Sequence, residues 1–243
     1  MIKKMLFRKN LFDYTKYTAG INLKPKEFSL KEGERAICLA PHADDESIGM
    51  GGTLALNPEK FEVILLTDGR KGVKNTPTDE VIESRKKEFE SAMKVAKIQN
   101  YSFLNCKDKE LLFYEDKFCK LEISSIDYIF VPNLIDQHPD HKAVSINLNK
   151  LLKQSKHKKN LKICFYEVWS ALGYVNGFVD IERVIETKKE MIASYPSQTS
   201  QKNYEYHALG LNQYRGMLKN KKYVEAFCIL SVEDFEKICK MYE

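Results

Sequence analysis

The chain contains 243 residues, of which 43% are hydrophobic and 30% are charged. This near-average balance excludes a disordered, collagen-like or low-complexity protein, and the length suits either one large α/β domain or two small ones. The net charge of +5 is compatible with an anionic small-molecule ligand, but it lies far below the cationic density of nucleic-acid-binding domains. We therefore expect no nucleic-acid partner.

The cysteines and the N-terminal residues indicate a reducing compartment. The six cysteines include no C-x-x-C pair, so the sequence predicts neither a disulfide framework nor a thiolate zinc site. The first residues are partly apolar, but Arg8 and Lys9 interrupt them before the apolar core of a signal peptide, about 7 residues long, can form. No run approaches the ~18 apolar residues of a membrane span. We expect a cytoplasmic protein without a transmembrane segment.

Apolar runs alternate with helical patterns after an irregular N-terminal extension of residues 1–34. Short apolar runs bounded by polar loops predict buried strands at residues 36–40, 62–67, 127–131, 161–166 and 224–230. Apolar periodicity and capping residues predict helices at residues 77–98, 141–154, 181–194 and 202–218. Because we find no internal repeat and no long linker, this alternation predicts a β/α sheet in one domain that spans residues 1–243.

The segment Pro41-His-Ala-Asp-Asp-Glu46 directly follows the first predicted strand. Open α/β sheets bind ligands at this carboxyl edge. His42 and Asp45 are three residues apart, so their side chains can converge on one point in a turn or a first helical turn, whereas Asp44 must point elsewhere. The segment therefore offers two potential metal ligands and one spare carboxylate.

A second cluster, Gln137-His-Pro-Asp-His141, follows the predicted strand at 127–131 and returns two more imidazoles to the same edge of the sheet. A catalytic zinc takes three protein ligands and keeps one position open for water. His42, Asp45 and one histidine of the second cluster satisfy this requirement. The absence of cysteine from both clusters argues against a closed structural zinc site. Each cluster alone would more often be surface decoration, but two complementary clusters at one sheet edge predict a metal site.

Three other features allow a structural as well as a functional interpretation. Gly49, Gly51 and Gly52 do not match the G-x-G-x-x-G spacing, so close packing of a helix on the sheet explains them better than a dinucleotide site. Arg85 lies on the apolar line of its helix and points inward, either to bind a ligand or to snorkel from the end of the stripe. The lysine-rich stretch 150–162 predicts a solvated helix end or contact with a nucleotide, a phospholipid or a membrane surface.

Both clusters resemble the signatures of a known family. Pro41–Glu46 resembles the A-H-P-D-D-E motif of the PIG-L/LmbE-like N-deacetylases, and His138–His141 resembles their H-P-D-H motif. Further similarities follow in chain order at Thr67-Asp-Gly69, Arg85-x-x-Glu88, Asp180, Lys188, Ser197-Gln198, Arg215-Gly216 and Glu225-Ala-Phe227. The resemblance extends from about residue 36 to residue 230. It departs at Ala43, where the family usually has proline, and at Val224, where alanine is common. The extension 1–34 is longer than the family pattern requires.

The resemblance implies an α/β fold with a Rossmann-like, doubly wound, mostly parallel sheet and helices on both faces. It also implies that zinc is held by His42, Asp45 and His141, a ligand set that Fe²⁺ or Co²⁺ would also accept. By the same resemblance, Asp44 is the general base that takes a proton from the attacking water.

The resemblance further implies that His138 is the second acid or electrostatic group, with Asp140 or Asp136 holding its ring in orientation. Arg85 would lie at the substrate pocket and donate hydrogen bonds to sugar hydroxyls or phosphate. Trp169 and Tyr166, which is placed at the end of a predicted strand, either stack on a sugar ring or serve as core aromatics.

We therefore expect an enzyme, a zinc-dependent hydrolase that removes an acetyl group from an N-acetylated amino sugar of the N-acetylglucosamine type. The sugar could be free or linked to a nucleotide, a lipid or another glycoside, and peripheral membrane contact is compatible with this reading. Two rivals are a metal-dependent hydrolase of another amide or ester bond and a non-catalytic sugar-binding module. The sequence leaves the oligomeric state open.

Overall fold

Within residues 25–242, which the computed structural model describes, eight strands form one mixed sheet in the order β1-β7-β8-β6-β5-β2-β3-β4. The strands span Lys26–Glu27 (β1), Ala36–Ala40 (β2), Phe61–Thr67 (β3), Tyr101–Cys106 (β4), Tyr128–Pro132 (β5), Lys162–Tyr166 (β6), Gly177–Asp180 (β7) and Val224–Ser231 (β8). The run from β6 through β5, β2 and β3 to β4 is parallel, whereas β8 is antiparallel to β6 and β7. The expectation of a mostly parallel sheet is confirmed.

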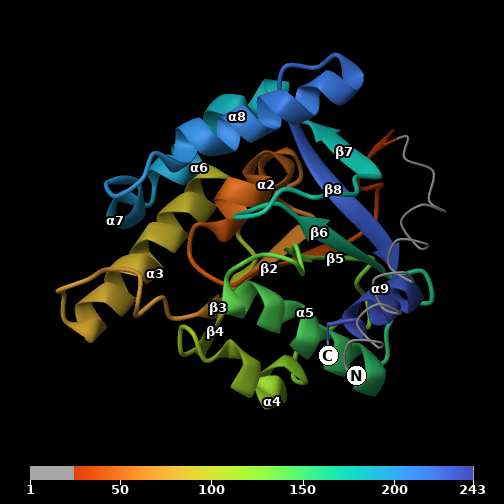
Figure 1. The fold of residues 1–243 in the computed structure, drawn as a ribbon, viewed down its shortest axis with the longest axis horizontal. Helices are drawn as coiled ribbons and strands as arrows, with labels where there is room; N and C mark the ends of the chain where they lie inside the picture. Colours follow the sequence, from red (N-terminus) through yellow and green to blue (C-terminus); the bar gives the residue numbers. More distant parts are fainter. Residues whose placement is uncertain (1–24, 243) are drawn as a thin grey trace, which may run out of the picture.

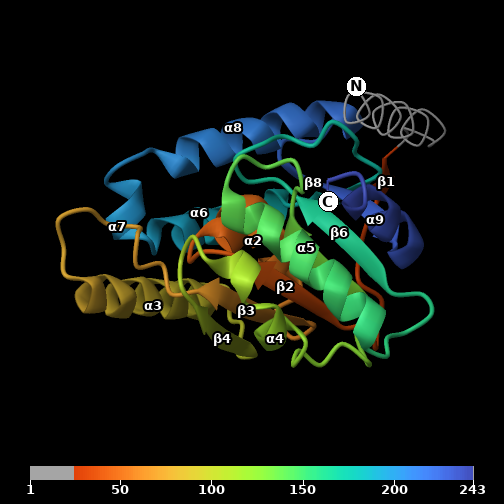
Figure 2. The same ribbon diagram turned by 60° about the horizontal axis from the view of Figure 1, so that its bottom comes forward.

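Helices cover both faces of this sheet, as Figures 1 and 2 show. Their bounds are Asp45–Leu56 (α2), Thr78–Val95 (α3), Glu115–Phe118 (α4), Pro139–Gln154 (α5), Ile185–Ala193 (α6), Pro196–Thr199 (α7), Tyr204–Gly216 (α8) and Val232–Cys239 (α9). Helices α4, α5 and α9 lie on one face, and α2, α3 and α6 lie on the other, where α8 packs against α2, α6 and β8. The doubly wound α/β architecture expected from the sequence is therefore present. No helix of this described range is long and apolar enough to cross a bilayer.

The buried strands are apolar on both faces because alternate side chains point to opposite sides of a sheet. Along β2, Ile37 and Leu39 join the core under α5 and α9, whereas Ala36 and Cys38 join the core under α2 and α3. All the residues of β2 are buried. This double burial produces the continuous apolar runs from which the central strands were predicted.

The glycines of α2 allow this helix to lie close to its neighbours. A Cβ atom added at Gly49 would lie 2.4 Å from Cδ2 of Tyr166, and one added at Gly52 would lie 2.6 Å from Cγ2 of Ile181. Real Cβ atoms do not approach other heavy atoms so closely. Close packing is therefore the role of these two glycines, as expected, and their spacing carries no dinucleotide site.

Part of the predicted irregular extension forms regular structure. Lys26–Glu27 pairs in parallel with β7 at the edge of the sheet, which corrects the expectation for this part of residues 1–34. Residues 1–24 lie outside the described range. Strands β4 and β7 and helix α9 are present in the structure but were not among the predicted elements. The helix expected at 181–194 begins with a separate 3-10 turn, Glu182–Val184, which precedes α6.

The positions of β2 and β5 determine where a ligand can bind. These two parallel strands are neighbours, yet the chain proceeds from β2 outward to β3 and β4 before it returns to β5 and continues to β6 on the other side. The segments that follow β2 and β5 therefore leave the same edge of the sheet in different directions. Open α/β sheets bind ligands in the crevice that forms at such a topological switch point.

Candidate metal centre and active-site cleft

Both predicted clusters meet at the carboxyl ends of β2 and β5. The turn after β2 carries His42 and leads into α2, whose first residue is Asp45. The loop after β5 leads to His138, which is the N-cap of α5, and Pro139 occupies the first turn of that helix. A proline is favoured there because it lacks the N–H group that a first turn leaves unpaired. His141 then lies inside the first turn of α5, facing the sheet.

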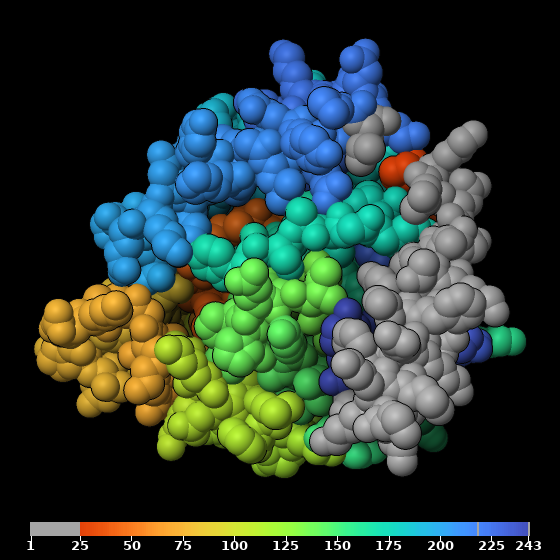
Figure 3. Space-filling model, in the orientation of Figure 1, coloured from red at the N-terminus to blue at the C-terminus, as the bar shows by residue number. Residues whose placement is uncertain are grey.

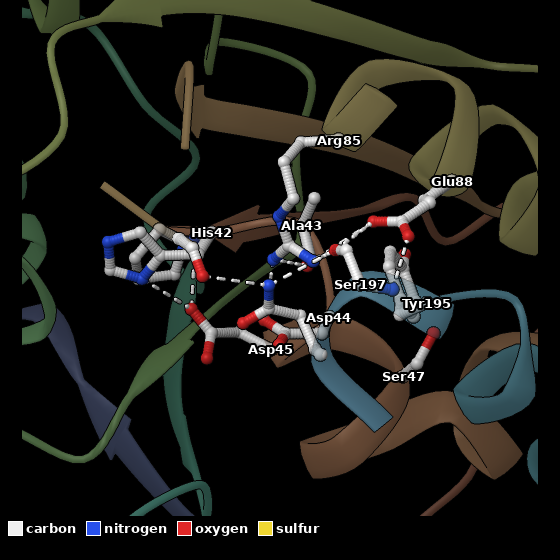
Figure 4. Close-up of polar contacts among 12 residues, drawn as sticks. His42, Ala43, Asp44, Asp45, Ser47, Arg85, Glu88, Tyr195 and Ser197 are labelled. Atoms are coloured by element: carbon white, nitrogen blue, oxygen red, sulfur yellow. Dashed lines mark hydrogen bonds and ion pairs between the residues drawn. The ribbon is translucent and has the colours of Figure 1, made fainter. Parts of the chain in front are cut away.

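Three side chains converge as the first cluster predicted. Oδ2 of Asp45 lies 3.2 Å from Nδ1 of His42 and 3.1 Å from Nε2 of His141. Ring nitrogens of His42, His138 and His141 also lie within 4.8 Å of one another. Figure 4 shows Asp45 beside His42, with Asp44 pointing towards Arg85 instead. The predicted divergence of the two adjacent aspartates is therefore confirmed.

The chemistry of this donor set fits a divalent cation. A tetrahedral zinc ion lies about 2.0–2.1 Å from its nitrogen and oxygen ligands, so two ligand atoms are about 3.3 Å apart. The distances from Oδ2 of Asp45 to the ring nitrogens of His42 and His141, 3.2 and 3.1 Å, are close to this value. Both ring nitrogens of His141 are buried and have no hydrogen-bond partner. Nδ1 of this ring lies 3.3 Å from Oδ2 of Asp136, which is the arrangement of a carboxylate that orients a metal-ligating histidine. Ring nitrogens of His42, His138 and His141 are thus close enough together to hold a metal ion, and Oδ2 of Asp45 lies beside two of these rings.

The electrostatics of these ligands are strongly coupled. Burial alone would lower the pKa of His141, but the carboxylates of Asp45 and Asp136 raise it to about 9. Burial likewise opposes a raised pKa for His42, yet hydrogen bonds to Asp108, Asp140 and Asp45 raise it well above its ordinary value. The pKa of Asp45 falls although burial opposes this, because both imidazoles stabilise its charged form. The pocket therefore places positive charge against the Asp45 carboxylate.

Asp44 is held apart from the ligand set at the start of α2. Its φ angle of 142° is one that side-chain-bearing residues rarely adopt, and such strain costs on the order of 1–3 kcal/mol. Burial raises the pKa of Asp44 to about 7, while the positive charge of Arg85 opposes this rise. Oδ1 of Asp44 lies 3.5 Å from Nη2 of Arg85. The strained backbone thus directs a carboxylate of near-neutral pKa along the wall of the cleft.

Arg85 points inward from α3, as its place on the apolar line predicted, and its side chain is 3% exposed. Its Nη1 atom donates to Glu88 and Ser197, and its Nη2 atom donates to the carbonyl oxygen of Ala43. The Nε atom is buried without a partner. The guanidinium therefore connects α3, α7 and the turn before α2 while it lines the cleft, which contradicts a snorkelling role.

The expected partners of His138 differ from those in the structure. Nδ1 of His138 accepts a hydrogen bond from the backbone N–H of Asp140, 3.2 Å away. The carboxylate of Asp140 instead lies 3.2 Å from Nε2 of His42, and that of Asp136 faces His141. The Asp140 carboxylate also accepts from the backbone N–H of Lys109, and that of Asp136 from the backbone N–H of His138 itself, so neither orients the His138 ring. Burial lowers the pKa of His138, and the nearby His42 and His141 imidazoles lower it further.

Asp108 is a site residue that the sequence analysis missed. It follows β4 and places Oδ1 3.4 Å from Nε2 of His42, while Oδ2 accepts from the backbone N–H of Lys71. Burial opposes ionisation, but the hydrogen bond with His42 lowers the pKa of Asp108 to about 2. Asp108, His42, His138 and Asp140 form a second potential ligand group. The only sequence feature that could have pointed to Asp108 is its position after β4, a strand that was not predicted.

A cleft of about 250 Å³ opens over these residues, and Trp169 and Tyr204 form part of its wall. Trp169 is 47% exposed, so it is available to a ligand. Tyr166 is fully buried, and its hydroxyl donates to the carbonyl oxygen of Leu39. Of the two aromatic residues considered above, Tyr166 is therefore a core residue and Trp169 borders the cleft.

Two buried ion pairs explain several of the later motif residues. Nζ of Lys188 lies 2.6 Å from Oε1 of Glu225, and both side chains are fully buried. The Glu225 carboxylate also accepts from the backbone N–H groups of Gly52 and Thr53, just beyond a kink in α2 at Met50. A separate pair joins Arg215 to Glu167. Lys188 and Glu225 thus support the helix that carries Asp45, whereas Arg215 and Glu167 join α8 to the segment after β6. None of these four residues lines the cleft.

The basic stretch lies at the far end of α5 from the metal centre. Lys150 pairs with Glu115 at 2.7 Å, and Lys158 pairs with Asp127 at 2.8 Å. Both lysine side chains remain more than a third exposed. The solvated helix end is thus supported by surface ion pairs, and contact with a phospholipid or nucleotide stays a prediction.

Part of the sequence matches a known family model. Residues 37–149 match the family model described as PIG-L: GlcNAc-PI de-N-acetylase. The chain is 27% identical over 187 residues to the probable N-acetyl-alpha-D-glucosaminyl L-malate deacetylase 2 of Bacillus subtilis, an alignment that covers 68% of this chain and 84% of that protein. Both motif clusters fall inside the segment that the family model matches.

Solved structures share the fold. The N,N'-diacetylchitobiose deacetylase from Pyrococcus horikoshii superposes with a TM-score of 0.71 at 20% identity, over 93% of this chain and 94% of that chain. The 4-carboxy-2-hydroxymuconate hydratase GalB from Pseudomonas putida superposes with a TM-score of 0.65 at 16% identity, over 81% and 96% of the two chains. Because one of these is a hydratase, the fold alone does not define the reaction. From its motifs, the family model that matches residues 37–149 and the related sequence, the chain is similar to the PIG-L/LmbE-like deacetylases.

Proposed function

We propose that this protein is a zinc-dependent N-deacetylase that hydrolyses the acetamide of an N-acetylated amino sugar, free or within a conjugate. The observation that carries this proposal is the position of Asp45 Oδ2 between ring nitrogens of His42 and His141, at 3.2 and 3.1 Å. Asp44 and His138 line the cleft beside them. The family model and the Bacillus relative support the acetamide as the bond that is cleaved.

His42, Asp45 and His141 would hold the metal ion. When bound, zinc would polarise the acetyl carbonyl and lower the pKa of a water molecule towards ~7. Fe²⁺ or Co²⁺ would accept the same nitrogen and oxygen donors. Asp136 would keep the His141 ring in place from behind, which leaves the cleft side of the centre free for substrate.

Asp44 takes the proton from the attacking water. A general base is most effective when its pKa lies near the operating pH, and burial brings the pKa of Asp44 to about 7. Arg85 favours the charged form of the carboxylate and holds the preceding carbonyl of Ala43. The base is therefore both fixed in position and able to accept a proton near neutrality.

His138 stabilises the negative charge that develops on the acetyl oxygen as water attacks. Its Nδ1 atom accepts from the backbone N–H of Asp140, so a neutral ring carries its proton on Nε2. Burial and the neighbouring imidazoles lower the pKa of His138, which favours this neutral form, and the Nε2–H group donates a hydrogen bond to the developing charge. The departing amine takes its proton from Asp44, which received it from the attacking water.

Arg85 contributes to substrate binding through its unpartnered Nε atom. The two Nη atoms are occupied within the protein, whereas Nε is buried at the cleft wall without a hydrogen bond. An unmade hydrogen bond at a buried donor costs about 1–3 kcal/mol, which a substrate hydroxyl or carbonyl would recover. Loss of this hydrogen bond should therefore raise KM and leave the rate of the chemical step unchanged.

The proposal is tested by amine release from N-acetylated amino sugars in free, nucleotide-linked and lipid-linked forms, with zinc-loaded protein. Asp44→Asn should lower the rate by a factor of about 10²–10⁴ and still bind about one metal per chain, because the three ligands remain. Asp127→Asn, which changes an aspartate at the opposite end of the sheet, is the matched control and should keep full activity. Undiminished release by Asp44→Asn would remove that residue from the reaction.

The same panel separates the rivals. Cleavage of other amides or esters, without amine release from any acetamido sugar, would favour a different hydrolase on the same metal centre. A sugar-binding module would instead bind sugars equally well with Asp44 or Asn at position 44 and release no amine under any condition. Metal content measured in parallel keeps a failure to load metal distinct from a wrong choice of bond.

A further inference from the structure

A second cavity of about 250 Å³ lies beside the metal cleft, and we call it the side pocket. The start of α2 at Ile48 forms its floor, Val168 forms one wall, and α8 closes it through Ala208 and Leu211. In the space-filling view, a hollow opens between α8 and the segment that follows β6, with atoms of α2 at its bottom (Figure 3). The side pocket takes no part in the mechanism given above.

The side pocket and the metal cleft share two walls. Trp169 and Tyr204 line both cavities, and their rings pack edge to face with centroids 5.6 Å apart. Nζ of Lys202 lies 4.7 Å from the Trp169 ring centroid at the rim. A ligand anchored at the metal centre would therefore meet this aromatic pair at the border of the side pocket, which adjoins the site where the acetamide would react.

The lining of the side pocket selects a neutral and mostly apolar group. Besides the aromatic pair, the walls carry four aliphatic side chains, Ile48, Val168, Ala208 and Leu211, together with the polar side chains of Lys202, His207 and Asn212. The one buried charge there, Glu167, is neutralised by Arg215 and also accepts from the backbone N–H of Leu172. A polar ligand would find few partners to replace its lost water, and burying it would be unfavourable.

One buried polar atom in the side pocket has no partner. Asn212 is 5% exposed, and its Oδ1 atom makes no hydrogen bond within the described residues 25–242, while its Nδ2 atom donates to the carbonyl oxygen of Val224 at 3.1 Å. That donation fixes which end of the amide faces the pocket. Buried acceptors without partners are rare in folded proteins. The pocket therefore offers one acceptor to a ligand that carries a single donor.

We propose that the side pocket binds an apolar aglycone, an alkyl or aryl group attached to the amino sugar whose acetamide lies at the metal centre. This inference rests on the deacetylase function proposed above and narrows its substrate class to glycosides with a hydrophobic aglycone. The cavity exceeds the ~150 Å³ that suffices for a benzene molecule, so a six-carbon chain or one aromatic ring fits it.

Binding can be measured independently of turnover because Trp169 is the only tryptophan in the chain and lines both cavities. Tryptophan fluorescence of the metal-loaded full chain would be titrated with n-hexyl and methyl β-D-glucosaminide, the deacetylated forms that cannot react further. Burial of each methylene lowers Kd about fourfold. We expect the hexyl glycoside to bind at least about tenfold more tightly, which requires two buried methylenes.

Two variants test whether the side pocket causes this preference. Ala208→Leu fills the pocket, and Leu211→Asn replaces an apolar wall by a polar side chain of similar volume, so each should reduce the preference to less than about threefold. Tyr214→Leu, at a position of α8 that is 61% exposed, is the matched control and should keep the preference. Equal Kd values for the two glycosides, an unchanged preference in both pocket variants, or tighter binding of chitobiose than of the hexyl glycoside would overturn the proposal.

Activity distinguishes failure of this inference from failure of the proposed function. The N-acetylated forms of both glycosides would be assayed for amine release under the same conditions. Amine release without a preference for the hexyl compound would refute the aglycone site and leave the deacetylase intact. A hexyl preference in binding, with no amine released from either compound, would refute the deacetylase and retain the pocket.

Discussion

The buried ion pair between Lys188 and Glu225 provides the sharpest test of how α2, the helix that begins at Asp45, is supported. Nζ of Lys188 lies 2.6 Å from Glu225 and 2.9 Å from the carbonyl oxygen of Ile48. Lys188→Met would remove the positive charge and leave the Glu225 carboxylate buried without a counter-ion. Breaking one side of a buried pair costs about 3–5 kcal/mol, because the remaining charge has been removed from water and nothing compensates it.

For a chain of this size, such a loss lowers Tm by roughly 6–20 °C. Thermal unfolding followed by circular dichroism would measure the shift. The matched control is Lys189→Met, the next residue along α6, whose partner Glu186 is 74% exposed. This solvated pair should contribute nothing measurable, so its Tm should equal that of the wild type.

A double variant, Lys188→Met with Glu225→Gln, refines the test. The amide oxygen of glutamine still accepts from the backbone of α2, but it carries no charge, so the double variant should recover part of the lost stability. Coupling between directly contacting residues is about 0.5–3 kcal/mol. If Lys188→Met is no more harmful than Lys189→Met, or if the two changes are simply additive, then the ion pair does not support α2 as argued.

The other predictions concern the metal ligands and the packing of α2. His141→Ala should lose both bound metal, measured by elemental analysis, and amine release, whereas His157→Ala, outside the centre, should keep both; normal metal content in His141→Ala would exclude it as a ligand. Gly52→Ala should destabilise the fold by about 1–3 kcal/mol in urea, because its Cβ would lie 2.6 Å from Ile181. Gly210→Ala, with no atom within 4 Å of the added carbon, should stabilise α8 by about 0.5–1 kcal/mol, and equal effects at both glycines would contradict the packing argument.

The central strands were predictable because burial on both faces leaves a local trace in the sequence. β2 and β6 are continuous apolar runs for this reason. The strand Tyr101–Cys106 is only partly buried at the sheet edge, so its mixture of polar and apolar residues gave no strand signal. Helix α9 does carry a helix signal, since Ser231 caps it before an apolar face with helical spacing.

The meeting of the two clusters was predictable because each cluster is contiguous and follows a strand. The position of Asp108 depends on β4, and no local motif marks it. The partners of His138 could not be predicted either, because a backbone N–H at a helix N-terminus, and not a carboxylate, contacts its ring. Contacts that depend on how separate strands and helices are placed relative to one another leave no pattern in a single sequence.

The support of α2 by Glu225 also ties the first half of the chain to the last strand of the sheet. The family model matches residues 37–149, yet the second half of α2 is anchored by a carboxylate more than 170 residues further along. A fragment that ended at residue 149 would expose the edge of β5 that pairs with β6, and it would lack both members of the buried ion pair. The matched segment is therefore a unit of sequence similarity and not a unit of folding, and an evolutionary exchange of the C-terminal half would have to preserve the lysine and the glutamate together.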